Sequence, residues 1–262
     1  MHNIAVILAG GTGTRMGGTM PKQFMPLGGR TVVEHSIDTF ERHPAIDEIA
    51  VVVHPAWRQQ METIVAGRRW SKLSMVIDGG QERYLSTLNA IMAFIDRDDE
   101  SNLLFHDAAR PLVSEGVITR VVSALRHCEA VGVAVPCTDT IWEVHPDMAM
   151  FGQESADGGS DALTERFGSR DFEMPRIVAR IPERRLMWQA QTPQAFRLPL
   201  IRDAYQRALQ DPQFAATDDC SVVRRYMPGT RICVVEGETA NFKLTTADDM
   251  RRAEIMTSDT TR

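Results

Sequence analysis

The stretch ILAGGTGTRMGGTMPKQF, residues 7–24, contains five glycines, one arginine and one lysine. It continues an apolar run, residues 4–9, with the composition of a strand that is buried on both faces. Gly10, Gly11 and Gly13 allow the backbone to approach a ligand closely and to turn its N–H groups towards it. A strand followed by such a loop indicates a phosphate-binding site in an α/β protein.

This loop is neither of two familiar nucleotide motifs. The third glycine of a dinucleotide fingerprint would fall at Met16, and a Walker A lysine would fall at Thr19. Arg15 and Lys22 suggest a triphosphate that is cleaved, because charge then develops on the reacting phosphorus and on the departing pyrophosphate. A glycine-rich turn without a ligand, flanked by exposed cations, is the alternative.

Short β-branched runs alternate with longer amphipathic stretches along most of the chain. We expect strands at residues 4–9, 49–53, 73–77, 103–106, 131–136 and 232–235. We expect helices at residues 32–40, 57–66, 86–95, 117–127, 199–209, 219–226 and 247–256. This rhythm predicts a doubly wound, mostly parallel, Rossmann-like sheet, with ligands beyond the carboxyl ends of its strands.

One stretch interrupts the rhythm. Residues 145–176 are rich in Gly, Ser, Asp and Glu and show weak periodicity, while the segments on either side have strand character. We expect a hairpin arm at about residues 142–182 on a single nucleotidyltransferase domain that comprises residues 1–262.

Composition limits the partners and the compartment. The formal net charge of -6 argues against general attraction to nucleic acid or to an anionic membrane. No apolar run has the length of a transmembrane helix, and we recognise no signal peptide, so we expect a cytoplasmic protein. The wide spacing of the four cysteines predicts reduced thiols, without a zinc site or a disulfide framework; they are Cys128, Cys137, Cys220 and Cys233.

Two more motifs lie where strands are expected to end. In DGGQERYLS, Gly80 allows close backbone approach, and Ser86 is either a helix N-cap or a ligand contact. In HDAARP, Asp107 is a candidate ligand for a divalent ion, and Arg110 is free to bind a second phosphate. A helix cap and a surface ion pair are their respective alternatives. We expect His106 to be structural.

These motifs, together with LMWQAQTPQAF, TDDCSVV and NFKLTT, span nearly the whole chain in one order. The sequence resembles the cytidylyltransferase family that includes 2-C-methyl-D-erythritol 4-phosphate cytidylyltransferase and ribitol-5-phosphate cytidylyltransferase. It differs in a longer segment between Thr140 and Arg184. In this family the arm tends to cross to a neighbouring subunit, so the resemblance implies a homodimer through the arm.

The resemblance also implies site residues. It implies a CTP site formed by Leu8, Ala9, Gly10, Gly11, Thr12, Gly13, Gly80, Gln81 and Ser86. It implies an acceptor site formed by Asp107, Arg110, Thr140, Arg184, Thr217 and Lys243, with Arg185 as an alternative to Arg184 and an N-cap role as the alternative for Thr217. Arg15, Lys22, Arg184 and Lys243 are the expected catalytic residues, and Asp107 the expected ligand of Mg²⁺ or another divalent cation.

The expected reaction joins CTP to a small polyol phosphate and releases pyrophosphate. The HDAARP motif favours methylerythritol phosphate and isoprenoid precursor synthesis, whereas the first loop is closer to enzymes that make CDP-ribitol for cell-surface polymers. A nucleotide-binding protein without catalysis is an alternative of another class. The presence of Arg15, Lys22, Asp107 and Lys243 argues against it.

Overall fold

The computed structural model describes residues 1–11, 20–146 and 176–259. The chain divides into two compact units. The larger contains Met1–Val135 and Ala190–Arg262, and the smaller contains Pro136–Gln189. No helix in the described ranges is long and apolar enough to cross a membrane.

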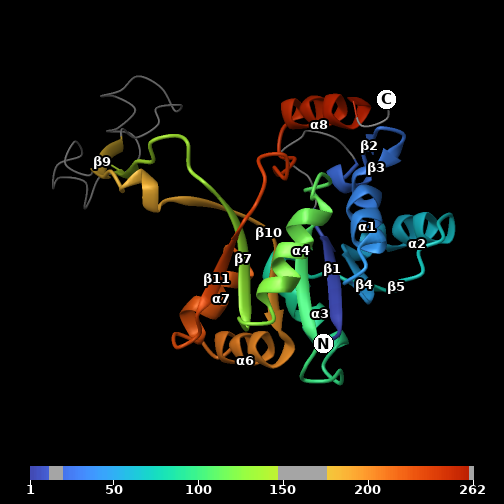
Figure 1. Cartoon of the computed structure of the whole chain (residues 1–262), viewed down its shortest axis with the longest axis horizontal. Coiled ribbons are helices and arrows are strands. Elements are labelled where there is room, and N and C mark those ends of the chain that lie inside the picture. Colours follow the sequence, from blue (N-terminus) through green and yellow to red (C-terminus); the bar gives the residue numbers. More distant parts are fainter. Residues whose placement is uncertain (12–19, 147–175, 260–262) are drawn as a thin grey trace, which may run out of the picture. The chain divides into compact units, whose positions relative to one another are not determined.

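A seven-stranded sheet of order β11-β7-β10-β6-β1-β4-β5 organises the larger unit (Figure 1). Its strands are β1 (Asn3–Ala9), β4 (Glu48–Val53), β5 (Leu73–Asp78), β6 (Asn102–Asp107), β7 (Ala130–Pro136), β10 (Trp188–Arg197) and β11 (Ile232–Glu236). Strand β1 pairs in parallel with β4 and β6, as do β4 with β5 and β7 with β11, whereas β10 runs antiparallel to β6. The mostly parallel sheet confirms the predicted fold class.

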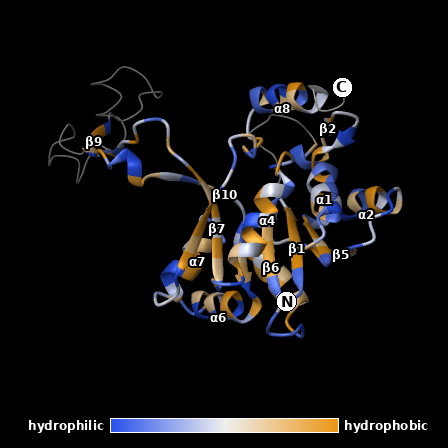
Figure 2. Cartoon of the chain, viewed as in Figure 1, coloured by the Kyte–Doolittle hydropathy of each residue, from blue (hydrophilic) through white to orange (hydrophobic). Residues whose placement is uncertain are grey.

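Helices cover both faces of this sheet. Alternate side chains of β1 enter different core clusters: Ile7 packs with α1 (Val32–Arg42), α2 (Arg58–Ala66) and α4 (Glu115–Ala124). Val6 packs with α3 (Arg83–Ala93), α6 (Leu198–Ala208) and α7 (Asp219–Tyr226). Figure 2 shows the central strands as apolar ribbons between helices of mixed character, as a sheet buried on both faces requires.

A small third cluster lies beyond the carboxyl end of β1. Leu27 of the β2 (Pro26–Leu27) and β3 (Arg30–Thr31) hairpin packs there with Leu244 and with α8 (Ala247–Asp259). Figure 1 shows α8 near this hairpin. Short 3₁₀ helices η2 (Lys22–Phe24), η3 (Pro55–Trp57) and η6 (Arg184–Leu186) complete the described elements. The C-terminal segment is thereby held above the strand ends.

Strand β10 is missing from the sequence-based prediction. Its sequence contains Pro193 and several glutamines, features that argue against a central strand. The buried Gln191 and Gln194 are nevertheless hydrogen-bonded, to Glu238 O and to the Asp218 carboxylate respectively. Lys243 lies in the loop that follows β11.

The smaller unit contains the predicted hairpin. Strands β8 (Glu143–Pro146) and β9 (Arg176–Arg180) pair antiparallel, which confirms that the two flanking segments form a ladder. The intervening residues 147–175 lie outside the described part of the chain. A single domain with an arm at 142–182 stays a prediction.

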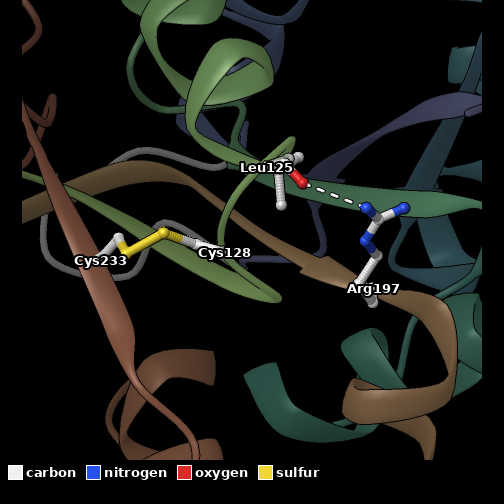
Figure 3. The surroundings of a disulfide bond; sticks show 4 residues. All are labelled: Leu125, Cys128, Arg197 and Cys233. Carbon is white, nitrogen blue, oxygen red and sulfur yellow. Dashed lines mark hydrogen bonds between the residues drawn. A yellow bond between two sulfur atoms is a disulfide. The ribbon is translucent and has the colours of Figure 1, made fainter.

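The expectation of reduced thiols without a disulfide is wrong for one pair. Cys128 and Cys233 form a disulfide across 105 positions of sequence (Figure 3). The parallel pairing of β11 with β7 places Cys233 opposite Val131, three residues after Cys128. Sequence spacing conceals this proximity, because it arises from the order of strands in the sheet. Cys137 and Cys220 are free.

Candidate active site

A cavity of about 300 Å³ opens at the carboxyl ends of β1 and β6. This is where an open α/β sheet places its ligands. The predicted residues that line it are Leu8, Ala9, Gly10, Gly11, Lys22, Gly80, Gln81, Ser86, Asp107 and Lys243. Gln23, Glu82, Arg83, Ala108, Ala109 and Thr245 complete its described lining.

The start of the glycine loop is held by a buried amide. Gln23 Nε2 donates to the carbonyls of Ala9 and Gly11, at 2.6 and 2.8 Å. These two contacts fix the backbone where β1 ends and the glycine loop begins. Thr12, Gly13 and Arg15, predicted for this site, lie outside the described residues.

The second glycine loop packs tightly against the first turn of α3. A Cβ on Gly80 would lie 2.1 Å from Cβ of Leu85, and one on Gly10 would lie 3.1 Å from Oγ of Ser86. The Gly80 N–H donates to Ser86 Oγ at 3.2 Å. Glu82, rather than Ser86, occupies the N-cap position, because the helix starts at Arg83. Ser86 therefore joins the two glycine loops from inside the helix.

Two lysines from opposite ends of the chain meet at this cavity. Lys22 Nζ donates to the carbonyl of Leu244, 222 positions away, at 2.8 Å. The Leu244 N–H in turn donates to Ala109 O at 2.8 Å. These contacts bring Lys22 and Lys243 to one loop beside the HDAARP turn. The cavity therefore holds positive charge from both chain ends.

Asp107 is surrounded by cations. Lys243 Nζ lies 2.8 Å from Oδ2, Arg83 Nε 3.6 Å from Oδ1, and Arg110 Nε 3.9 Å from Oδ2. Burial acts to raise the pKa of the Asp107 carboxyl, but the charges of Arg83, Lys243 and Arg110 outweigh it and hold that pKa well below its ordinary value. Asp107 is thus ionised throughout the physiological range.

His106 has the structural role predicted for it. Its ring is fully buried, with Nε2 3.0 Å from Arg110 O and Nδ1 3.0 Å from Thr192 Oγ1. Burial lowers the pKa of His106 to about 4, so the ring is neutral at pH 7. Nε2 must then donate to the carbonyl, and Nδ1 accepts from Thr192, whose hydroxyl accepts the Asp107 N–H. This chain of bonds fixes the turn that carries Asp107.

Arg110 is less available than the sequence suggests. Its side chain is 12% exposed, so the alternative of a surface ion pair is wrong. Nη1 donates to Asn241 O at 2.8 Å and Nη2 to Ala190 O at 3.3 Å. Asp107 is not a helix cap either, because it ends β6 and Ser114 caps α4. Binding of a second phosphate by Arg110 stays a prediction.

The donor set fits a metal ion that arrives with its substrate. Within the described ranges, no group of three or more His, Cys, Asp or Glu side chains is placed to hold a metal. The carboxylates among the described lining residues are those of Glu82 and Asp107. Mg²⁺ is commonly bound by one or two carboxylates together with phosphate oxygens and water. Asp107 as its ligand stays a prediction.

Four predicted acceptor residues are not among the described residues that line the cavity: Arg110, Thr140, Arg184 and Thr217. Thr217 is exposed, and its N-cap alternative is wrong because Asp218 caps α7. Thr140 and Arg184 belong to the smaller unit, and both are exposed. There, Arg184 Nη1 donates to Thr138 O at 3.2 Å, two residues before Thr140, whereas Arg185 pairs with Glu183.

Sequence reasoning missed four supporting residues: Gln23, Arg83, Thr192 and Asn241. All four stand inside quoted motifs, and for Gln23 and Arg83 the motif is one of the two glycine-containing stretches, which was a usable signal. Asn241 Nδ2 donates to Thr192 O at 2.8 Å, and both are buried. Their pairing spans 49 positions and has no signal in a single sequence.

Comparison with known proteins decides the family. A family model described as 2-C-methyl-D-erythritol 4-phosphate cytidylyltransferase matches residues 3–174 and 169–259. The chain belongs to this family. Members of the 2-C-methyl-D-erythritol 4-phosphate cytidylyltransferase family are CTP-dependent enzymes, so the predicted class is confirmed.

Individual relatives agree with this family. The 2-C-methyl-D-erythritol 4-phosphate cytidylyltransferase of Thermobifida fusca is 41% identical over 252 residues, covering 96% of this chain and 92% of that protein. A bifunctional ribulose 5-phosphate reductase/CDP-ribitol pyrophosphorylase of Haemophilus influenzae is 37% identical, covering 95% of this chain and 46% of that protein. The crystal structure of 4-diphosphocytidyl-2C-methyl-D-erythritol synthase from Anaerococcus prevotii superposes with a TM-score of 0.76 at 28% identity, covering 98% of both chains.

Proposed function

We propose that this chain transfers the cytidylyl group of CTP to 2-C-methyl-D-erythritol 4-phosphate and releases pyrophosphate, a step in the synthesis of isoprenoid precursors. The observation that carries the proposal is the meeting of Lys22 and Lys243 beside two glycine loops and Asp107 in one cavity. Such an arrangement suits an anionic nucleotide on one side and a second anion on the other.

The reaction needs positioning and charge stabilisation rather than a covalent enzyme intermediate. An oxygen of the acceptor phosphate, already anionic, attacks the α-phosphorus in line as the bond from that phosphorus to the bridging oxygen of pyrophosphate breaks. Lys22, with Arg15 in our proposal, stabilises the charge that develops there and on pyrophosphate. Lys243, fixed by its 2.8 Å bond to Asp107, holds the acceptor phosphate.

A divalent cation completes the proposal. Mg²⁺, when bound with the triphosphate, neutralises part of its charge, and Asp107 is the protein ligand that we propose for it. Glu82, the other described carboxylate of the cavity, precedes α3 and is next to the loop assigned to the base.

The Gly80–Ser86 loop supports a preference for cytosine. The contacts of Gly80 and Ser86 hold this loop against the start of α3, and we propose that its backbone groups recognise the base. We therefore expect CTP with Mg²⁺ to raise the melting temperature more than ATP, GTP or UTP does, because a ligand that binds only the folded state stabilises it. Differential scanning fluorimetry of the four titrations measures this.

Two variants test whether the loop at Gly80 is responsible for the CTP-induced shift in melting temperature. Gly80→Ala should lose most of the CTP-induced shift, since its Cβ meets Leu85. Gly229→Ala is the matched control, because no heavy atom lies within 4 Å of the Cβ that it adds. Equal shifts for all four nucleotides in the wild-type protein would remove cytosine recognition from this loop.

We assign the acceptor phosphate to Arg184 and to Thr140, which follows the hydrogen-bond partner of Arg184, Thr138, by two residues. The hydrogen bond of Arg184 to Thr138 O supports this choice over Arg185, which pairs with Glu183. Arg184→Ala should raise the KM for the polyol phosphate roughly tenfold or more, lower kcat and leave the KM for CTP nearly unchanged, as loss of one charge-assisted phosphate contact implies. Arg185→Ala is the control, and steady-state kinetics with each substrate varied supplies the values.

A collapse of CTP affinity in Arg184→Ala, with an unchanged acceptor KM, contradicts the assignment of Arg184 to the acceptor phosphate.

We also propose that the smaller unit forms a homodimer contact, because it exposes Ile141, Trp142, Ile177 and Val178. Light scattering on the same wild-type preparation gives the mass in solution, and a strictly monomeric enzyme removes this contact.

D-ribitol 5-phosphate is the second candidate acceptor. The similarity to the Haemophilus influenzae protein, which covers nearly all of this chain, is the observation that favours it. Both acceptors are small polyol phosphates, so the cations assigned here serve either one. Competition between them for the same enzyme separates the two proposals.

A further inference from the structure

Arg83 lies between two carboxylates that come from different elements. It is the first residue of α3, and its side chain is 28% exposed and lines the cavity. Nη2 lies 2.9 Å from Oδ2 of Asp219, and Nε lies 3.6 Å from Oδ1 of Asp107. One planar guanidinium therefore links the start of α7 to the end of β6.

Asp219 anchors this arginine from the core. Its side chain is fully buried, and Oδ1 accepts the Tyr205 hydroxyl at 2.7 Å. Oδ2 has no well-directed hydrogen bond within the described residues and faces Arg83 as an ion pair. A buried carboxylate is costly without a partner charge, so Asp219 restrains the Arg83 guanidinium. Burial acts to lower the pKa of Arg83, but Asp219 and Asp107 outweigh it and raise that pKa.

The two oxygens of Asp107 face different cations. Lys243 contacts Oδ2, and Arg83 faces Oδ1. We propose that Arg83, anchored by Asp219, is a positioning residue that fixes the orientation of the Asp107 carboxylate for the cytidylyl transfer. The inference rests on the proposed function and adds a link from the loop assigned to CTP to the side assigned to the acceptor. A purely structural ion pair, by contrast, affects stability alone.

Arg83→Lys and Asp219→Asn test this role. Lysine keeps the positive charge beside Asp219 but lacks the planar fork that reaches both carboxylates. Arg83→Lys should lower kcat roughly ten- to a hundredfold, the cost of a small misplacement near the reaction. The KM for CTP should change less than about threefold, because the glycine loops remain. Asp219→Asn should also lower kcat, although Asp219 is fully buried and is not among the described residues that line the cavity.

A double-mutant cycle with Asp107→Asn separates positioning from direct contact. If Arg83 acts through Asp107, Arg83→Lys changes kcat by less than about threefold in the Asp107→Asn background, because coupled residues are not additive. Arg97→Lys is the matched control: Arg97 lies 2.9 Å from the largely buried Glu48, at the opposite end of the sheet. It should affect the melting temperature without affecting kcat.

All assays are run well below each variant's melting temperature and normalised to the folded fraction. Additive losses in the cycle, or wild-type kcat in folded Arg83→Lys and Asp219→Asn, overturn the inference alone. A wild-type enzyme that forms no cytidylyl product overturns the proposed function, and this inference with it. Should Arg83→Lys not fold, the Asp219→Asn and Asp107→Asn cycle gives the same comparison.

Discussion

Lys22→Ala should lower kcat by roughly a hundredfold or more, the usual scale for the loss of one preorganised charge at a transition state. CTP binding should weaken less, because Gln23 still holds the start of the glycine loop through the carbonyls of Ala9 and Gly11. The variant also loses the bond from Lys22 Nζ to Leu244 O, so the loop after β11 needs a separate check. Steady-state kinetics and CTP-induced thermal shifts on the same preparation give both quantities.

Lys72→Ala is the matched control for the loss of a hydrogen bond from a lysine to a backbone carbonyl. Lys72 Nζ also donates to a backbone carbonyl, that of His43, at 2.7 Å, but Lys72 is not among the described residues that line the cavity. It should retain wild-type kcat. A Lys22→Ala enzyme within a few-fold of wild type would falsify the transition-state role of Lys22.

Lys243→Ala should lower kcat by roughly a hundred- to a thousandfold, because it removes a preorganised cation from the reacting phosphates. It should also raise the acceptor KM and leave the KM for CTP within a few-fold. Asp107 loses its 2.8 Å partner and keeps the more distant Arg83 and Arg110, so its carboxylate becomes less firmly oriented. Varying each substrate in turn measures the two KM values.

A loss of CTP affinity with an unchanged acceptor KM would contradict the assignment of Lys243 to the acceptor phosphate. If the KM for CTP rises while the acceptor KM and kcat stay near wild type, Lys243 belongs to the nucleotide site. Lys243→Arg adds a second comparison, since arginine keeps the charge but replaces a compact ammonium with a planar fork. Partial recovery of kcat in Lys243→Arg supports a role in charge stabilisation.

The sequence predicted the parallel strands well, because a strand buried on both faces is a continuous apolar run. It failed for β10, in which Gln191 and Gln194 are buried but hydrogen-bonded to distant residues. A single sequence shows that these side chains are polar and does not show their partners. The disulfide of Cys128 with Cys233 was missed for the same reason.

The residues of the candidate site also divide into those that a local motif indicates and those whose role depends on distant partners. Residues at strand ends, such as Gly80 and Asp107, were recoverable because parallel strands end at one edge of the sheet. Arg83 stood within a quoted motif, yet its importance comes from Asp219, which is fully buried 136 positions later in the chain. Long-range charge pairs of this kind require coordinates. Arg15 stays a prediction, because it lies outside the described residues.

The central claim is a reaction, and product analysis tests it most directly. Purified wild-type protein is incubated with CTP and Mg²⁺ and with either 2-C-methyl-D-erythritol 4-phosphate or D-ribitol 5-phosphate, and ³¹P NMR follows the products. We expect CDP-methylerythritol and an equal amount of pyrophosphate from the first acceptor, with a much smaller kcat/KM for the second. Preferential formation of CDP-ribitol contradicts the proposed acceptor, and the absence of any cytidylyl product contradicts the account as a whole.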